Sequence, residues 1–401
     1  MNRLISLLLT WLALTVSAQT TTYEAVVIDA HTHQPLPYAS IFISRTNSTI
    51  TNAEGGFSIA CQPSDVLQIS YVGYKATSVV ADKMGSQVKL APIVAMLSEV
   101  TVRPNSSFLK RAITLTELQL KKNRKKKANF FYRQTAYADS TCYEFMEAFL
   151  KGQSAVWLRN LALNKGRFAG IQPDSINYYS YYANFFSSSQ IPVTTQPGMK
   201  AQPDDRYPLT KFCEEHYDIS YKLIADEEDS LMAVHFAPKP TNKVILDATL
   251  YFDPATYMLR KMEGQELNLI VMHKKEREDR KKEELNKFFG QESYDDIIET
   301  ELHFVVNMSE DREFLEVQSV IIDELHQLYG KTIKTHSLLF NIGDRQISGG
   351  KQLAADDNLH DIIEDQGYDK QFWTDNEIVL CTPIEKQVLG LFESRRLFGV
   401  F

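Results

Sequence analysis

Residues 23–44 read YEAVVIDAHTHQPLPYASIFIS, and this stretch carries the clearest fold signal in the chain. Its first six residues end in three β-branched side chains, which indicates a strand. Residues 31–37 hold two prolines and favour a turn, and residues 38–44 alternate in polarity and are β-branched again. The stretch therefore predicts two strands joined by a proline-containing turn.

More short strands follow on the C-terminal side of this pair. Residues 52–56 (NAEGG) are a turn signal, and β patterns resume at residues 57–59 and 66–71. Gly55 and Gly56 supply the backbone freedom that a tight turn needs. Short strands separated by turn signals predict an all-β sandwich over residues 19–103.

Four sequence blocks in this region resemble the carboxypeptidase-like regulatory domain, a family of transthyretin-like β-sandwiches. They are VIDAHTHQPLPYASI at 27–41, TNAEGGF at 51–57, LQISYVGY at 67–74 and LSEVTV at 97–102. The resemblance implies a module of exported and outer-membrane proteins of Gram-negative bacteria, often placed ahead of a second domain. It implies a scaffold or interaction role and no peptidase activity. His31 and His33 lie in the turn of this module, and two histidines without further ligands do not predict a zinc site.

Residues 1–18 read MNRLISLLLTWLALTVSA and have the three parts of a signal peptide. Arg3 supplies the positive start, an apolar run follows, and small residues precede a cleavage site between Ala18 and Gln19. The run is shorter than a membrane-spanning helix requires. We therefore expect an exported protein that is periplasmic or associated with the outer membrane.

Export permits disulfides, and the chain has four cysteines, Cys61, Cys142, Cys213 and Cys381. Their wide spacing forms no metal or redox motif, and buried free thiols are the favoured interpretation. Cys142 and Cys213 are the first pair to test for a disulfide, because both lie in the second domain.

A helical, basic linker is predicted over residues 104–128. Residues 108–119 have helical spacing of apolar side chains, and six cations follow. They can contact anionic lipid head groups at a membrane surface, or they can simply be a solvated helix end. The cations are Lys121, Lys122, Arg124, Lys125, Lys126 and Lys127.

Residues 129–401 predict an α+β domain built on an antiparallel sheet with helices on one face. Strand patterns occur at 130–136, 143–150, 155–163, 302–307, 314–322 and 331–340, and a hairpin turns at the DPAT of 253–256. Several blocks are similar to the domain that commonly trails the regulatory module, which has no assigned activity. They are FYRQT at 131–135, YEFMEA at 143–148, LYFDPATY at 250–257, DKQFW at 369–373 and TPIE at 382–385.

Motifs for bond-making chemistry are missing from the sequence. It contains no GxSxG, HExxH, P-loop or GxGxxG pattern. The H-x-x-E at 273–276 falls in a run of mixed charges that offers no dry cavity for zinc. The four acids at 226–229 do not have the spread of a calcium loop. We predict no catalytic residue, no metal site and no cofactor.

Tyr178, Tyr179, Tyr181 and Tyr182 form the densest aromatic stretch. Each tyrosine offers a flat apolar ring and a polar tip, which suits contact with a glycan or an envelope protein. The alternative is that these rings pack in the core of the domain.

Composition agrees with a folded, exported, mainly β protein. Of 401 residues, 44% are hydrophobic and 23% charged, and the net charge of −8 argues against a nucleic-acid binder. The preferred hypothesis is a non-enzymatic envelope protein with an adaptor sandwich and a larger domain that binds an unidentified partner or ligand. A hydrolase with a site built from scattered residues and an outer-membrane receptor-like component are the alternatives.

Overall fold

The computed structural model describes residues 20–93, 106–123, 126–153, 159–171, 207–225, 229–239, 246–266, 297–309, 315–328, 331–353 and 359–398. The signal sequence with Ala18 and Gln19 lies outside these ranges, as do the tyrosines at 178–182 and the H-x-x-E at 273–276. Within the described part, no helix combines the length and the apolar composition that a membrane crossing needs.

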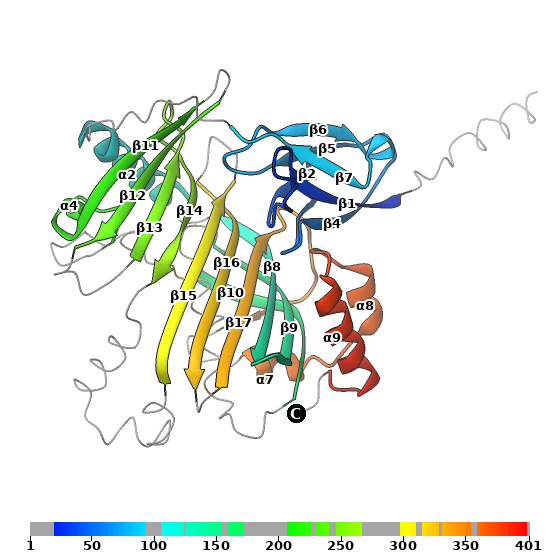
Figure 1. Cartoon of the computed structure of the whole chain (residues 1–401). Coiled ribbons are helices and arrows are strands. Elements are labelled where there is room, and N and C mark those ends of the chain that lie inside the picture. Colours follow the sequence, from blue (N-terminus) through cyan, green and yellow to red (C-terminus); the bar gives the residue numbers. More distant parts are fainter. Residues whose placement is uncertain are drawn as a thin grey trace, which may run out of the picture.

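The N-terminal part is a β-sandwich, as the sequence predicts (Figure 1). One sheet has three strands in the order β4 (Gly56–Cys61), β1 (Thr21–Asp29) and β7 (Gln87–Leu90), with β1 and β7 parallel. The other has four, in the order β3 (Asn47–Ile50), β2 (Ser40–Ser44), β5 (Val66–Ser70) and β6 (Thr77–Val80). Alternate residues of both sheets fill a closed core, in which Val27, Ile41 and Leu67 are fully buried.

The turn at 31–37 is held from inside by Asp29. Its Oδ1 accepts hydrogen bonds from the backbone N–H groups of His31 and Thr32, and its Oδ2 accepts from the hydroxyl of Tyr74. These bonds satisfy a buried carboxylate and join the turn to the loop after β5.

The larger part is a single antiparallel sheet of eleven strands within the described ranges. In spatial order the strands are β11 (Tyr217–Ala225), β12 (Ser230–Pro238), β13 (Leu246–Phe252), β14 (Leu259–Glu266), β15 (Ile297–Met308), β16 (Val317–Leu328), β17 (Lys331–Asn341), β8 (Lys127–Ala138), β9 (Thr141–Gln153), β10 (Arg159–Gly170) and β18 (Lys351–Gln352). The hairpin at 253–256 is confirmed, since Asp253 Oδ1 accepts from the N–H groups of Ala255 and Thr256 between β13 and β14. Strands β11 and β12 were not predicted.

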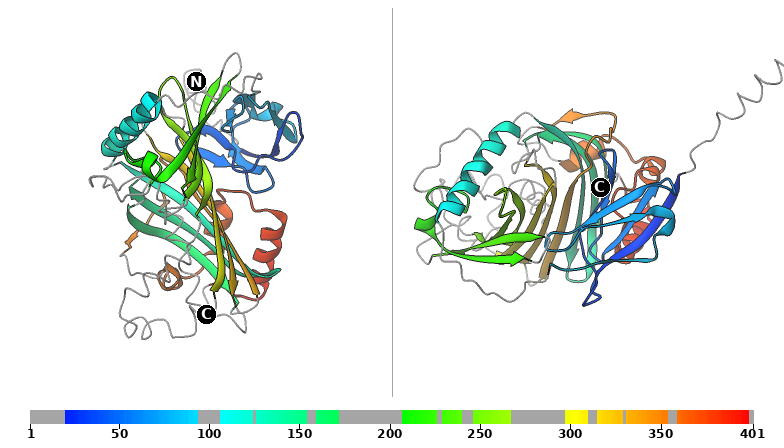
Figure 2. Two further views of the ribbon diagram at one scale, coloured as in Figure 1. Left: turned by 60° about the vertical axis from the view of Figure 1, so that its left-hand side comes forward. Right: turned by 90° about the horizontal axis from the view of Figure 1, so that it is seen from above.

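The sheet curls around an apolar interior, and helix α2 (Ser106–Asn123) lies along its concave side (Figure 2). Leu109, Ala112 and Ile113 of α2 pack into this core, together with Ile362 and Ile363 of α7 (Leu359–Glu364). The short α4 (Cys213–His216) precedes β11. One side of helix α2 is therefore part of the core of the large domain. The predicted domain boundaries at 103, 128 and 129 stay predictions.

The prediction of helices on one face is wrong, because helices cover both faces of the sheet. On the outer face, Phe149 stacks on Trp373 of α8 (Lys370–Asp375) and Phe131 belongs to the same cluster, while Phe145 packs with Phe392 of α9 (Pro383–Ser394). Both faces of β8 and β9 are consequently buried, which explains their nearly continuous apolar sequence.

The TPIE block at 382–385 is the start of α9. The Thr382 hydroxyl accepts from the N–H of Glu385, and the Glu385 carboxylate accepts from the N–H of Thr382. This capping box satisfies two donors at the helix start and sets the direction in which α9 leaves the sheet.

Candidate functional site

A cleft with a volume of about 640 Å³ lies between the sandwich and one end of the large sheet. The sandwich contributes the outer face of its four-stranded sheet and the loop after β5. The large domain contributes the ends of β8, β12 and β14–β17. This volume is in the range of small-molecule sites, and neither domain could form the cleft alone.

The sandwich wall is lined by small polar side chains. Ser40 on β2 lies directly opposite Ser70 on β5, and in the next row Phe42 lies opposite Gln68 and Ser48. Because side chains alternate along a strand, the intervening residues Ile41 and Ile69 point into the sandwich core. The alternation that builds the sandwich thus also builds this polar wall.

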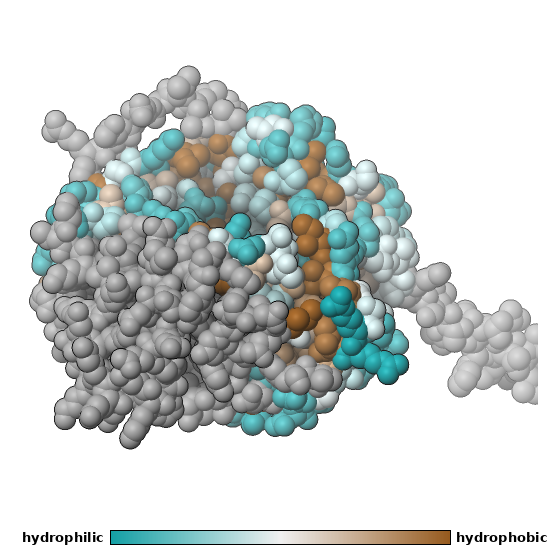
Figure 3. Space-filling model, turned by 60° about the horizontal axis from the view of Figure 1, so that its bottom comes forward, coloured by the Kyte–Doolittle hydropathy of each residue, from teal (hydrophilic) through white to brown (hydrophobic). Residues whose placement is uncertain are grey.

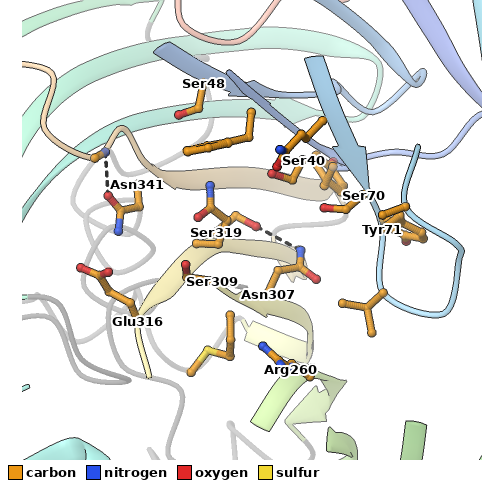
Figure 4. A pocket seen from close by; sticks show the side chains of 18 of the residues that line it. Ser40, Ser48, Ser70, Tyr71, Arg260, Asn307, Ser309, Glu316, Ser319 and Asn341 are labelled. Atoms are coloured by element: carbon orange, nitrogen blue, oxygen red, sulfur yellow. Dashed lines mark hydrogen bonds between the residues drawn. The ribbon is translucent and has the colours of Figure 1, made fainter. Parts of the chain in front are cut away.

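The facing wall is carried by neighbouring strands of the large sheet (Figure 4). Asn307 on β15 lies opposite Ser319 on β16, and its Nδ2 donates to the Ser319 hydroxyl over 3.0 Å. Asn341 at the end of β17 is fixed twice, because its Nδ2 donates to the carbonyl of Val317 and its Oδ1 accepts from the N–H of Gly343. These amides are held in place before any ligand arrives.

The charged groups of the cleft are arranged in pairs. The nitrogen–oxygen distances are 3.0 Å for Arg45 with Asp344, 2.9 Å for Lys126 with Glu316 and 3.4 Å for Arg260 with Asp253. The first pair joins the two domains. In the Asp253 carboxyl, burial acts to raise the pKa, and hydrogen bonds from Thr256 and Ala255, with Arg260, outweigh it and hold that pKa below its usual range.

Aromatic side chains line the sandwich side of the cleft, and one of them holds a buried lysine. The Lys261 ammonium lies 5.4 Å from the ring centre of Tyr71 in the sandwich and 5.6 Å from that of Tyr251 on β13. It also lies 2.7 Å from a carboxylate oxygen of Glu263. A cation between two rings and a carboxylate is a fixed contact between the domains.

Tyr38, His336 and Asp323 form a hydrogen-bonded chain that crosses from the sandwich to the sheet. The Nδ1 of His336 is 2.7 Å from Asp323 Oδ1, and its Nε2 is 3.2 Å from the Tyr38 hydroxyl. Since a carboxylate can only accept, Nδ1 donates to it, and in the tautomer with this proton on Nδ1 the Nε2 atom is left to accept from the Tyr38 hydroxyl.

This chain has the order of a nucleophile, a base and an orienting acid, but the tyrosine does not suit the first role. Burial, followed by the nearby Asp323 and Glu385, raises the pKa of Tyr38 far above its ordinary value. The phenol therefore stays protonated, and the chain acts as a bridge between the domains.

The two domains are also joined through residues 378–380, which lie between them. The hydroxyl of Thr49 donates to the carbonyl of Ile378 over 2.6 Å, and the amide of Asn52 donates to that of Leu380 over 3.1 Å. From the sheet, Arg133 Nη2 donates to the carbonyl of Val379 over 2.7 Å. Three consecutive carbonyls thus accept bonds alternately from the sandwich and from the large domain.

A buried ionic network supports this segment. Arg133 is 3% exposed and contacts Glu147 through its Nε and Nη2, and Arg167 reaches the other oxygen of the same carboxylate. In Glu147, burial acts to raise the pKa, but Arg167 and Arg133 together hold it below the ordinary value. The Arg167 guanidinium also lies 4.7 Å above the ring of Trp373.

A second polar cluster lies on the inner face of the sheet. Tyr132 donates to Gln134 Oε1, and Gln134 Nε2 donates to Glu144 Oε1 over 2.6 Å. The other oxygen of Glu144 is 3.4 Å from His360 Nε2 on α7. The cluster connects β8, β9 and α7 within the apolar core and so orders the sheet that carries the cleft wall.

The predicted basic run is divided by the structure. Lys121 and Lys122 are exposed at the end of α2, Lys126 pairs with Glu316, and Lys126 and Lys127 line the cleft. Arg124 and Lys125 lie outside the described residues. Peripheral contact of this run with a membrane stays a prediction. Figure 3 shows a face on which apolar and polar residues are interspersed. Helix α9 exposes two large apolar side chains, Ile384 and Leu391.

All four cysteines are free thiols, and Cys142 and Cys213 do not form a disulfide in this structure. Burial raises the pKa of the thiols of Cys142 and Cys381 to about 12 and of Cys213 to about 11. His31 and His33 are both exposed in their turn, and among the described residues no group of histidine, cysteine and acidic side chains could hold a metal ion.

Sequence reasoning missed the cleft entirely. Its lining comes from residues 38 to 344 and contains no local motif. One usable signal was present, because residues 40–42 and 68–70 alternate between core side chains and the outward-facing Ser40, Phe42, Gln68 and Ser70, which no predicted contact explained.

Comparisons with solved structures give distant likenesses. A LolA superfamily protein from Nitrosomonas europaea is 8% identical, with 59% of this chain and 93% of that chain covered and a TM-score of 0.21. A DUF1329 family protein from Desulfovibrio piger is 7% identical, with 60% and 94% covered and a TM-score of 0.20. A chain of the MucA/MucB complex of Pseudomonas aeruginosa is 10% identical, with 62% and 99% covered and a TM-score of 0.16. TM-scores this low do not establish a shared fold.

No curated protein matches the chain. One family model does, that of the CarboxypepD_reg-like domain, and it matches residues 24–102. The match spans all seven sandwich strands except the start of β1. The N-terminal sandwich of this chain is a CarboxypepD_reg-like domain.

Proposed function

We propose that this chain is an exported binding protein of the cell envelope that holds its ligand in the interdomain cleft and makes or breaks no bonds. The observation that carries the proposal is the cleft itself, whose two walls come from different domains and in which the amides of Asn307 and Asn341 on the sheet wall are fixed in advance. Fixed groups lose little conformational entropy when a ligand binds, which favours affinity.

The chemistry of the described residues supports binding over catalysis. The hydrogen-bonded series Tyr38–His336–Asp323 resembles a catalytic arrangement, but burial raises the pKa of its tyrosine. The thiols are held protonated for the same reason, so they are poor nucleophiles.

The sandwich in this proposal is one wall of the binding site and not an adaptor at the end of a flexible link. Support comes from the three carbonyls at 378–380, the Lys261 contact with Tyr71 and the Tyr38–His336 hydrogen bond. The export signal at residues 1–18 supports a location in the periplasm or at the outer membrane, where a glycan or an envelope protein would be the partner.

Filling the cleft tests the proposal. The mature chain, Ser40→Trp and the matched control Ser86→Trp are immobilised, and a native envelope extract is passed over each. Ser40 lines the cleft. Ser86 is exposed, lies directly before β7 of the three-stranded sheet and is not part of the cleft lining. We expect mass spectrometry to find molecules retained by the mature chain and by Ser86→Trp and lost from Ser40→Trp. Equal retention by all three chains, or native protein recovered from the cytosol with Met1 in place, would contradict the proposal.

A further inference from the structure

We propose that the ligand of the interdomain cleft is a neutral oligosaccharide. The inference rests on the proposed function, because it names the class of molecule that the same cleft would take. It comes from a juxtaposition in the lining, where groups that both donate and accept hydrogen bonds lie beside the exposed ring of Phe42, and where the numbers of cations and carboxylates are equal.

The sandwich wall offers hydroxyl and amide groups to a ligand. Among the described residues, the side chains of Ser40, Ser48, Ser70 and Gln68 form no hydrogen bond to one another or to their surroundings. A serine hydroxyl donates one bond and accepts others, and a glutamine amide does both through different atoms. A sugar hydroxyl has the same dual capacity, so it can pair with these groups in either direction.

Asn307 gives the facing wall a preference for a ligand that donates a hydrogen bond. Its side chain is 8% exposed, its Nδ2 is used by Ser319, and its Oδ1 has no hydrogen-bond partner in the described part of the chain. An amide oxygen left in this condition costs free energy until a donor reaches it. A ligand hydroxyl that donates to Oδ1 would remove that cost, and Ser319 keeps its own proton for a second bond.

The charges exclude a strongly ionic ligand. The lining holds four cations and four carboxylates, so its charges balance, and three of each lie in the pairs Arg45–Asp344, Lys126–Glu316 and Arg260–Asp253. A phosphate or a carboxylate would have to break one of these pairs, while an uncharged ligand leaves them intact. The lining therefore favours a molecule without net charge.

The aromatic rings supply the apolar half of the contact. Phe42 is 38% exposed although it lies in the lining of a cleft, and Tyr71 lies in the same lining. Sugar rings have one or two faces of C–H groups that stack on such a surface, while their hydroxyls point to the sides. Phe42 lies between Ser48 and Gln68 across the strands, so a stacked ring would have polar partners on both flanks.

Two other ligand classes fit the cleft less well. A lipid chain needs a predominantly apolar lining, and serine and amide groups make up much of this one. An extended peptide that adds a strand needs an open sheet edge. Strands β2 and β5, which carry the wall, are central strands of their sheet, and each is paired on both sides.

The experiment is calorimetric titration of the mature chain with maltotetraose, cellotetraose, xylotetraose, mannotetraose and tetra-N-acetylchitotetraose as separate probes. We expect at least one probe to bind, with an affinity that does not change between low and high salt, because no charge pair is exchanged. Phe42→Ala should weaken that affinity about tenfold, and Phe42→Tyr should retain it. Val66→Ala is the control, since Val66 is an exposed apolar residue of the same sheet outside the cleft lining.

Failure of this inference can be told apart from failure of the proposed function. If no probe binds, or if Phe42→Ala and Val66→Ala behave alike, the oligosaccharide inference is wrong. If the envelope molecules lost from Ser40→Trp are then found to be peptides or lipids, the cleft is still a binding site and only its ligand class has been misassigned. If Ser40→Trp loses nothing, both are wrong.

Discussion

Replacing Arg133 by alanine should destabilise the whole protein and not one domain alone. The guanidinium is buried, pairs with Glu147 at 2.6 Å, donates to the carbonyl of Val379 at 2.7 Å and lies 3.6 Å from Glu385. Its removal leaves the Val379 carbonyl without its donor and reduces the counter-charge around a carboxylate that is 2% exposed. The segment at 378–380 thus keeps its bonds from Thr49 and Asn52 of the sandwich and loses the bond that Arg133 donates from the large sheet.

The expected loss of unfolding free energy depends on the contacts that Glu147 keeps after Arg133 is removed. Removing one partner of a buried ion pair costs about 3–5 kcal/mol of unfolding free energy. Glu147 keeps its bond to Arg167, so we expect the lower half of that range, about 3–4 kcal/mol. Arg133→Lys, which keeps the charge and loses the planar fork, should fall between the wild type and Arg133→Ala.

Urea unfolding followed by circular dichroism and by intrinsic fluorescence measures the effect. Arg45→Ala is the matched control, because Arg45 also forms an interdomain ion pair, with Asp344, but both side chains are more than half exposed. That variant should lose less than about 1 kcal/mol. A loss of this small size in Arg133→Ala as well would refute the reasoning, because it would mean that the buried network does not hold the C-terminal segment in place.

Three further outcomes are expected. Because the folded pKa of Glu147 lies below its unfolded value of about 4.3, its contribution is complete above that pH and is lost as the pH falls through the folded value; acid titration of stability should therefore be flatter in Glu147→Gln, and an unchanged profile would count against the network. Gly343 has φ +60°, and a Cβ there would overlap the carbonyl oxygen of Arg45; Gly343→Ala should lower the thermal midpoint and speed proteolysis between the domains, whereas Gly350→Ala, with φ +147° and open space, controls for backbone strain alone. A thiol reagent at pH 8 should react slowly with the folded chain and with all four cysteines after unfolding, since burial raises their pKa values; rapid loss of any thiol from the folded protein would show that its site is open.

The sandwich was predictable because its strands are half-buried. In residues 38–44 and 66–71 core side chains alternate with polar ones, and this period of two is the strongest local signal a strand gives. The DPAT turn was predictable for a similar reason, since the Asp253 side chain bonds to the backbone within the turn itself. Both depend only on neighbours in the sequence.

The sequence pattern did not predict that helices cover both faces of the large sheet. Helices on both sides bury Phe130 and Phe131 on opposite faces of β8, and such a strand reads as one apolar run with no alternation. Such an uninterrupted apolar run is itself a signal that both faces of a strand are covered. Strand β11 is the edge strand of the sheet, and none of its residues after Tyr217 is fully buried, so its apolar signal is weak.

The cleft could not be predicted from the sequence, because its residues become neighbours only when the domains dock. Ser319 and Ser70 have ordinary polar positions in their own strands, and their shared role depends on the contacts that Arg133, Lys261 and Tyr38 make between the domains. Affinity and interdomain stability should consequently be coupled. Arg133 does not line the cleft, so Arg133→Ala should weaken ligand retention only by loosening the walls, in proportion to its loss of stability. Phe42→Ala should weaken binding with little loss of stability, because Phe42 is already exposed. A site located elsewhere on the molecule would not link these two variants in this way.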